Sequence, residues 1–242
     1  MALLLLAYLL CLPRQLFDMP YATVVTDSHG ELLGARIAAD GQWRFPPSDT
    51  APDKFARCLI AFEDRYFYLH NGVNPAAILR AFVQNVRARR IVSGGSTITM
   101  QTIRLSRGER RTVGEKLIEM ILAGRLECRY SKREIMALYA AHAPFGGNVV
   151  GVEAATWRYF GHSSAELSWA EAAMLAVLPN APSMIHLSRN REALLRKRNR
   201  LLRELHRQGV IDDADCELAL SEALPDAPLP LPRLAPHLVA DF

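Results

Sequence analysis

Residues 92–101 of this chain read Val-Ser-Gly-Gly-Ser-Thr-Ile-Thr-Met-Gln, a glycine-rich loop that runs directly into residues favouring a helix. Glycines let backbone amides approach an anion, and a helix N-terminus favours negative charge. One acidic candidate, Glu63, precedes the loop and another, Glu119, follows it. The loop therefore indicates chemistry on a substrate that carries phosphate, although an ordinary flexible connection is the plainer interpretation. It is not a P-loop, because no Gly-Lys-Ser/Thr ending follows.

Glu63 is the first candidate for proton transfer, against the alternative of a surface acid on a helix. Aromatic neighbours are expected to desolvate it partly, which raises the pKa of a carboxylate toward the range useful for catalysis. These neighbours are Phe62, Tyr66, Phe67 and Tyr68. Asp64 either raises the pKa of the neighbouring Glu63 further through like-charge repulsion or faces water. His70 is interpreted as a hydrogen-bonded structural histidine rather than as an acid or base.

Glu119 is the second candidate, on a helix expected between Thr112 and Glu127. Glu115 already has a structural role as the capping partner of Thr112, which leaves Glu119 for chemistry or as a solvent-facing charge. Apolar residues recur there at helical spacing and place Lys116, Glu119 and Glu127 around the rim. They are Val113, Leu117, Met120, Ile121 and Leu122.

The charge of the chain favours anionic partners. Its 242 residues include 29 Lys plus Arg against 25 Asp plus Glu, for a net charge of +4. The excess gathers at residues 87–90, 104–111 and 189–207. Such patches suit nucleic acid, acidic lipid surfaces or phosphorylated substrates.

The chain divides into four segments. Residues 1–19 begin with an aliphatic run that is shorter than the roughly 20 residues of a membrane span. We interpret them as the remnant of a membrane anchor or as a signal segment, rather than as a buried helix. Residues 20–47 predict a small β-hairpin with turns between β-branched runs. Residues 48–222 form a helical body, and residues 223–242 form a semi-rigid, proline-rich tail.

Capping signals make the body mainly α. Asn74 followed by Pro75 predicts an N-cap with proline at the first helical position. Three further pairs have the spacing of a capping box, and two glycines stand where helices are expected to stop. The pairs are Thr112 with Glu115, Ser131 with Glu134 and Ser168 with Glu171, and the glycines are Gly161 and Gly209.

Several of these motifs, in this order, closely resemble the peptidoglycan glycosyltransferase domain of class A penicillin-binding proteins. The segments that carry the resemblance are 63–72, 94–101, 111–119 and 132–139. Two further segments are most like the C type, Ala-Pro-Phe-Gly-Gly at 143–147 and Glu-Ala-Ala-Met-Leu-Ala-Val-Leu-Pro at 171–179. With the hairpin and residues 198–202, the likeness covers about residues 20–205.

The resemblance implies a mainly α, lysozyme-like domain with a membrane-dipping lobe, acting on lipid II at the periplasmic face of a bacterial inner membrane. It implies that Glu63 is the general base and that Glu119 assists the departing undecaprenyl pyrophosphate, with inversion at the anomeric carbon. Substrate contacts would come from Ser96, Thr97, Gln101, Arg104, Arg111 and Lys116. Mg²⁺ or Mn²⁺ would help without a dedicated protein site, and the partners would be the growing glycan strand and cell-wall synthesis proteins.

Three positions depart from the family pattern. Glu115 stands where arginine is usual, Met100 where glutamine is common, and Ala141 where asparagine is common. No Ser-x-x-Lys occurs in the sequence, so we expect no transpeptidase domain and no binding of β-lactams. These departures leave a catalytically weak cell-wall scaffold as the main rival function.

Two more distant rivals stay open. A lysozyme-like hydrolase would cut glycan with an acid and water, but it has no need for the cation-rich loop. Nucleic-acid binding by the arginine-rich helix at 189–207 is a third interpretation, which export would exclude. We therefore expect no nucleic-acid partner.

Overall fold

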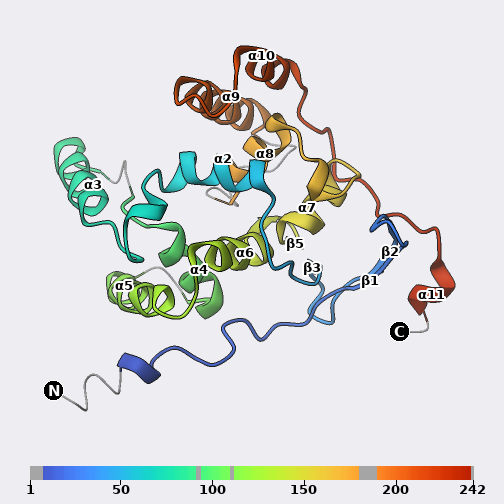
Figure 1. Ribbon diagram of the computed structural model, residues 1–242, viewed down its shortest axis with the longest axis horizontal. Helices are drawn as coiled ribbons and strands as arrows, with labels where there is room; N and C mark the ends of the chain where they lie inside the picture. Colours follow the sequence, from blue (N-terminus) through green and yellow to red (C-terminus); the bar gives the residue numbers. More distant parts are fainter. Residues whose placement is uncertain (1–7, 91–93, 110–111, 180–189, 241–242) are drawn as a thin grey trace. The chain divides into compact units, whose positions relative to one another are not determined.

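The computed structural model describes residues 8–90, 94–109, 112–179 and 190–240. Helices dominate these ranges, with a few short strands, so the prediction of a mainly α protein is confirmed (Figure 1). The chain forms two compact units. Unit 1 comprises Glu63–Tyr139 and the described part of Met1–Asp18, and unit 2 comprises Met19–Phe62 and Ala140–Phe242 as far as it is described.

Unit 1 is built around two antiparallel helices. Its elements are η1 (Phe67–Leu69), α3 (Pro75–Ala88), α4 (Ile98–Arg107), α5 (Val113–Glu127) and the first part of α6 (Lys132–His142). Helices α4 and α5 pack against each other (Figure 1). Thr99 Oγ1 near the start of α4 donates to Glu127 Oε1 at the end of α5, 2.6 Å away. Arg107 at the end of α4 lies 3.0 Å from Glu115 near the start of α5.

Asn74 and Ser131 cap helices of unit 1 as expected, whereas Thr112 caps α5 with the Glu115 carboxylate bound elsewhere than in the predicted capping box. The Asn74 side chain accepts from the Ala77 amide at 3.0 Å, with Pro75 at the first position of α3. Ser131 and Glu134 exchange capping hydrogen bonds at the start of α6. Thr112 caps α5 by accepting from the Glu115 amide at 3.1 Å, while the Glu115 carboxylate binds Arg107.

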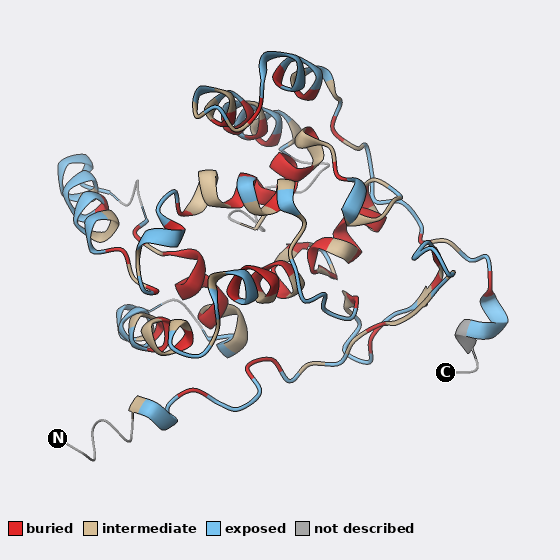
Figure 2. Ribbon diagram, in the orientation of Figure 1, coloured by how far each residue is buried: buried red, intermediate tan, exposed pale blue. Residues whose placement is uncertain are grey.

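The rim prediction for α5 is wrong. Its apolar residues Val113, Leu117 and Ile121 are 83%, 56% and 57% exposed, whereas Glu119 is only 6% exposed. The buried face contains Glu119 together with Leu122, Ala123 and Leu126 (Figure 2). Helical spacing shows which residues share a face, but it does not show which face meets the core.

Unit 2 contains the strands and the C-terminal helices. Its strands are β1 (Thr23–Thr26), β2 (Leu32–Arg36), β3 (Trp43–Arg44), β4 (Pro144–Gly146) and β5 (Val149–Val150). Its helical elements are α2 (Asp53–Glu63, whose last residue falls in unit 1), the end of α6, α7 (Val152–Tyr159), η2 (Ser164–Glu166), α8 (Trp169–Val177), α9 (Arg191–Arg207), α10 (Asp213–Ser221) and α11 (Pro236–Ala240).

The predicted hairpin is confirmed, because β1 and β2 pair antiparallel with Thr23 opposite Arg36. Asp27 supports the turn by accepting from the amides of His29 and Glu31. Strand β3 lies outside the hairpin and joins a second sheet in the order β3-β5-β4. Helix α8 forms the core of this unit, since its residues Ala172–Val177 are almost fully buried (Figure 2).

The segment after α10 is bound along unit 2 through its main chain. Arg191 donates to the carbonyls of Leu224 and Pro225. The Leu229 amide donates to the Arg158 carbonyl at 2.6 Å, and the Leu234 amide donates to the Leu33 carbonyl at 2.8 Å. These bonds place the proline-rich segment beside β2 and α7.

None of the helices within the described ranges is long and apolar enough to cross a membrane.

Candidate active site

Glu63 ends α2 and is half-buried. Its Oε2 accepts a hydrogen bond of 2.9 Å from Nε2 of Gln101, a residue of α4 that is 5% exposed. A buried amide that donates to a carboxylate fixes the orientation of that carboxylate. Gln101, which was predicted as a substrate contact, therefore binds Glu63 and orients its carboxylate.

Glu119 is buried in the middle of α5, on the face that includes Ala123. One ion pair and one hydrogen bond join α4 and α5 and fix their register. The ion pair is between Arg107 and Glu115, and the hydrogen bond is between Thr99 and Glu127. In this register, Glu119 lies alongside the C-terminal half of α4, roughly one to two helical turns from Gln101. Within unit 1, Glu63 thus contacts α4 through Gln101, and Glu119 lies on the buried face of the helix that packs against α4.

Tyr139 is a further residue beside Glu63. It is 1% exposed, and burial raises the pKa of its hydroxyl far above the ordinary value. The negative charge of Glu63 adds to that rise in pKa, while Arg104 opposes it. Tyr139 thus lies close enough to Glu63 and to Arg104 for both charges to act on its hydroxyl. Tyr139 ends the motif at 132–139, so its place in that motif could have marked it as a residue of the site.

The expected aromatic surroundings of Glu63 are only partly present. Tyr66 and Tyr68 are 50% and 64% exposed, so they do not enclose the carboxylate. Phe67 is fully buried. Consecutive residues of the short helix η1 point in different directions, which is why one ring enters the core while its neighbours meet solvent.

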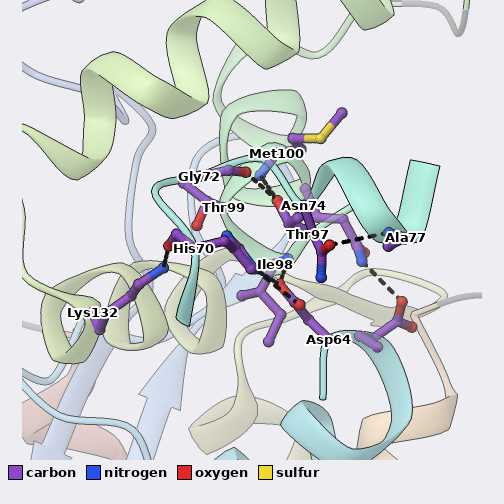
Figure 3. Close-up of polar contacts among 12 residues, drawn as sticks. Asp64, His70, Gly72, Asn74, Ala77, Thr97, Ile98, Thr99, Met100 and Lys132 are labelled. Atoms are coloured by element: carbon purple, nitrogen blue, oxygen red, sulfur yellow. Dashed lines mark hydrogen bonds and ion pairs between the residues drawn. The ribbon is translucent and has the colours of Figure 1, made fainter. Parts of the chain in front are cut away.

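Asp64 and His70 form a buried pair at the start of α4 (Figure 3). His70 Nε2 lies 2.9 Å from Asp64 Oδ2, and the two side chains are 7% and 4% exposed. Asp64 Oδ2 also accepts from the Ile98 amide at 3.2 Å. Asp64 is therefore buried rather than exposed to water. Its carboxylate binds His70 and the first turn of α4, so its charge does not act on Glu63 alone. The structural interpretation of His70 is supported by this pair.

Residues of the glycine-rich loop bind and pack against other parts of the chain. Thr97 Oγ1 donates to the Gly72 carbonyl and accepts from the Met100 amide at 3.1 Å (Figure 3). A Cβ on Gly95 would lie 2.8 Å from Ile78 Cα, so this glycine allows close packing on α3. The negative charge at the N-terminus of α4 is thus Asp64, and Ser96 is the half-buried hydroxyl of the loop.

The predicted cations lie at two places. Arg104 is half-buried, and its Nη2 is 3.5 Å from Gln101 Oε1, at the outer limit of a hydrogen bond. Lys116 is exposed on the first turn of α5. Arg111 lies outside the described residues. Contact of these residues with a substrate stays a prediction.

Within the parts of the chain that the structure describes, no group of three or more His, Cys, Asp or Glu side chains could hold a metal ion. The involvement of a divalent cation therefore stays a proposal.

Comparisons with known proteins place the domain. The transglycosylase family model matches residues 30–206. Penicillin-binding protein 1C of Escherichia coli is 42% identical over 226 residues, which are 93% of this chain and 29% of that protein. Penicillin-binding protein 1A of Aquifex aeolicus is 40% identical over 85% of this chain and 28% of its own length. A crystal structure of penicillin-binding protein 1A from Haemophilus influenzae covers 88% of this chain and 22% of its own, with a TM-score of 0.47 and 20% identity.

The chain belongs to the transglycosylase family, which confirms the resemblance drawn from its motifs. It spans less than a third of the length of these two relatives.

Proposed function

We propose that this chain is a peptidoglycan glycosyltransferase, which polymerises lipid II into glycan strands and releases undecaprenyl pyrophosphate. One observation carries the proposal: Glu63 is oriented by Gln101 of α4, and Glu119 is buried on α5, the helix that packs against α4. The family to which the chain belongs supplies the reaction class.

The two acids suit the two halves of this reaction. A sugar hydroxyl is a weak nucleophile until a base receives its proton, and Glu63 would take the proton of the acceptor 4-hydroxyl. A pyrophosphate leaves readily when its growing charge meets hydrogen-bond donors and cations. Arg104 and Lys116 would supply cations for this purpose. Glu119 would assist the departing pyrophosphate either directly, as a protonated carboxyl that donates a hydrogen bond, or through a divalent cation. A single displacement without a covalent intermediate gives inversion.

The test is polymerisation of lipid II by the detergent-solubilised protein with Mg²⁺ or Mn²⁺, with and without a chelator. Glycan strands support the proposal. A folded sample that makes no strands would favour the scaffold function instead. That alternative is supported by Glu115 and Ala141, which depart from the family pattern. Release of reducing ends from finished peptidoglycan would favour a hydrolase.

The carboxylate of Glu115, which stands where the family usually has arginine, forms a salt bridge with Arg107. Arg107 holds its carboxylate through three nitrogen-to-oxygen contacts of 3.0 to 3.3 Å. The anion is therefore neutralised by a cation of the preceding helix. We therefore expect Glu115 to weaken phosphate binding less than an unpaired anion would.

The charges of this pair give a prediction for substrate affinity. We expect Arg107→Gln to raise KM for lipid II about three- to tenfold, because Glu115 is then an uncompensated anion near the diphosphate. Glu115→Gln leaves a cation and lowers KM by a few-fold, in keeping with the roughly 1 kcal/mol of half-exposed pairs. Steady-state kinetics at low and high salt measure both. Equal KM values in the two variants would show that the pair is remote from the diphosphate.

We also propose that unit 1 rests on the periplasmic face of the bacterial inner membrane. Its helix α3 exposes large apolar side chains, which in a water-soluble surface usually mark an interaction site. They are Leu79, Phe82, Val83 and Val86. The same helix has Arg80 and Arg87 and no acidic residue, which suits anionic lipid headgroups.

Membrane contact predicts a loss of vesicle binding in a charged variant. We expect Phe82→Glu to weaken partition into phosphatidylglycerol vesicles about ten- to a hundredfold, because burying a Phe side chain contributes roughly 1.5–3 kcal/mol. Leu218→Glu is the matched control, since Leu218 of α10 is 64% exposed, as Phe82 is at 65%. Co-sedimentation with vesicles measures both. An equal loss in the two variants would contradict contact through α3.

A further inference from the structure

Lys132, at the start of α6, lies at the centre of a buried polar cluster. Its Nζ donates to the His70 carbonyl and to Glu127 Oε1, each at 2.7 Å. It also lies 4.4 Å from the centre of the Phe67 ring. The side chains of Lys132 and Glu127 are only 18% and 8% exposed. Figure 3 shows the Lys132 side chain directed at the main-chain oxygen of His70.

The cluster joins α4, α5, the start of α6 and the segment of residues 64–70. Glu127 ends α5 and accepts from Thr99 of α4 at 2.6 Å. The carbonyl that Lys132 binds belongs to His70, whose ring holds Asp64. Asp64 follows Glu63 directly in the chain.

Glu63 is thereby held from two directions. On the chain side, the bond from Lys132 to His70 fixes the segment that includes Asp64. On the α4 side, Asp64 binds the Ile98 amide at 3.2 Å, and Gln101 one turn later donates to Glu63. Displacement of the His70 carbonyl would loosen both constraints at once.

We propose that Lys132 is a positioning residue for Glu63, acting through the main chain at His70; this inference rests on the proposed function of Glu63 as the base. The ammonium does not touch the reacting atoms. It fixes the backbone of residues 64–70 so that the carboxylate of Glu63 stays beside Gln101. Small displacements of a catalytic group are costly, since about 1 Å can lower a rate 100-fold.

The first test is Lys132→Met, which keeps the length of the stem and removes both hydrogen bonds. We expect kcat for lipid II polymerisation to fall about ten- to a hundredfold, with KM changed less than about twofold. Lys54→Met is the matched control, because Lys54 also lies over an aromatic ring, 5.8 Å from the centre of Trp169 in unit 2. We expect its kcat to be unchanged.

A second variant separates positioning from simple loss of stability. Lys132→Met leaves the buried Glu127 carboxylate without this cation, so its Tm should fall. Adding Glu127→Gln removes that charge and keeps an acceptor for Thr99, so Tm should recover in the double variant. We expect kcat to stay low there, because the His70 carbonyl still lacks its donor. Recovery of kcat together with Tm would overturn the proposal, since Lys132 would then serve only as the partner of Glu127.

A measurement without turnover keeps the inference apart from the proposed function. Amide hydrogen exchange across residues 64–72 should be faster in Lys132→Met and in the double variant, and unchanged in Lys54→Met. Unchanged exchange in Lys132→Met overturns the positioning role whatever the activity. Faster exchange in a protein whose wild type makes no glycan would support the positioning of this segment and refute polymerisation.

Discussion

The Glu63→Gln protein is expected to lose about 10²- to 10⁴-fold in kcat for lipid II polymerisation, the usual contribution of general base catalysis. Glutamine has the size of glutamate, and its carbonyl oxygen still accepts from Gln101, which donates at 2.9 Å in the native protein. The substitution therefore removes proton acceptance and retains the geometry. KM should change little, because Glu63 is oriented by the protein rather than by the diphosphate.

Polymerisation of fluorescent lipid II measures this loss, and thermal unfolding checks that the variant is folded. Glu31→Gln is the control, since Glu31 is an exposed acid in the hairpin and has no part in the site. A kcat within threefold of the wild-type value in a folded Glu63→Gln sample would remove Glu63 from the mechanism. The second acid, Glu119, would then need a different partner.

Gly72→Ala is expected to lower the stability of the protein strongly. Gly72 has φ +81, and a Cβ there would lie 2.6 Å from the backbone carbonyl group of Ala123 in α5. A left-handed alanine costs roughly 1–2 kcal/mol, and a steric overlap in a packed interior adds about 1–3 kcal/mol. We expect a loss of about 2–5 kcal/mol in the free energy of unfolding, measured by urea denaturation.

Two other glycines divide this loss into its causes. Gly30 has φ +90 and nothing within 4 Å, so Gly30→Ala tests backbone strain alone. Gly95 has no left-handed backbone, but a Cβ would lie 2.8 Å from Ile78 Cα, so Gly95→Ala tests crowding alone. If Gly72→Ala destabilises no more than Gly30→Ala, the close contact with α5 is not a constraint in solution.

Local signals in the sequence predicted the local structure well. Asn74, Ser131 and Ser168 cap helices as expected, and each acts on an amide within three residues of itself. The glycines Gly161 and Gly209 end α7 and α9 with φ +82 and +68. Such features depend on neighbours along the chain, and sequence shows those neighbours directly.

Features that depend on tertiary contacts were not predictable in this way. Asp64 is a buried partner of His70 and Ile98, and the second of these lies 34 positions away. Lys132 and the His70 carbonyl are 62 positions apart. The outward apolar face of α5 likewise depends on what packs against the helix, and periodicity is silent about that.

The main-chain bonds of the segment after α10 bear on how shorter versions of the protein are prepared. A version that stops at Glu222 would strip β2 of its pairing at Leu33 and deprive Arg191 of two carbonyl acceptors. An uncovered strand edge is a template for association between molecules. Samples truncated there should therefore tend to oligomerise, and those that keep residues through Leu234 should remain dispersed.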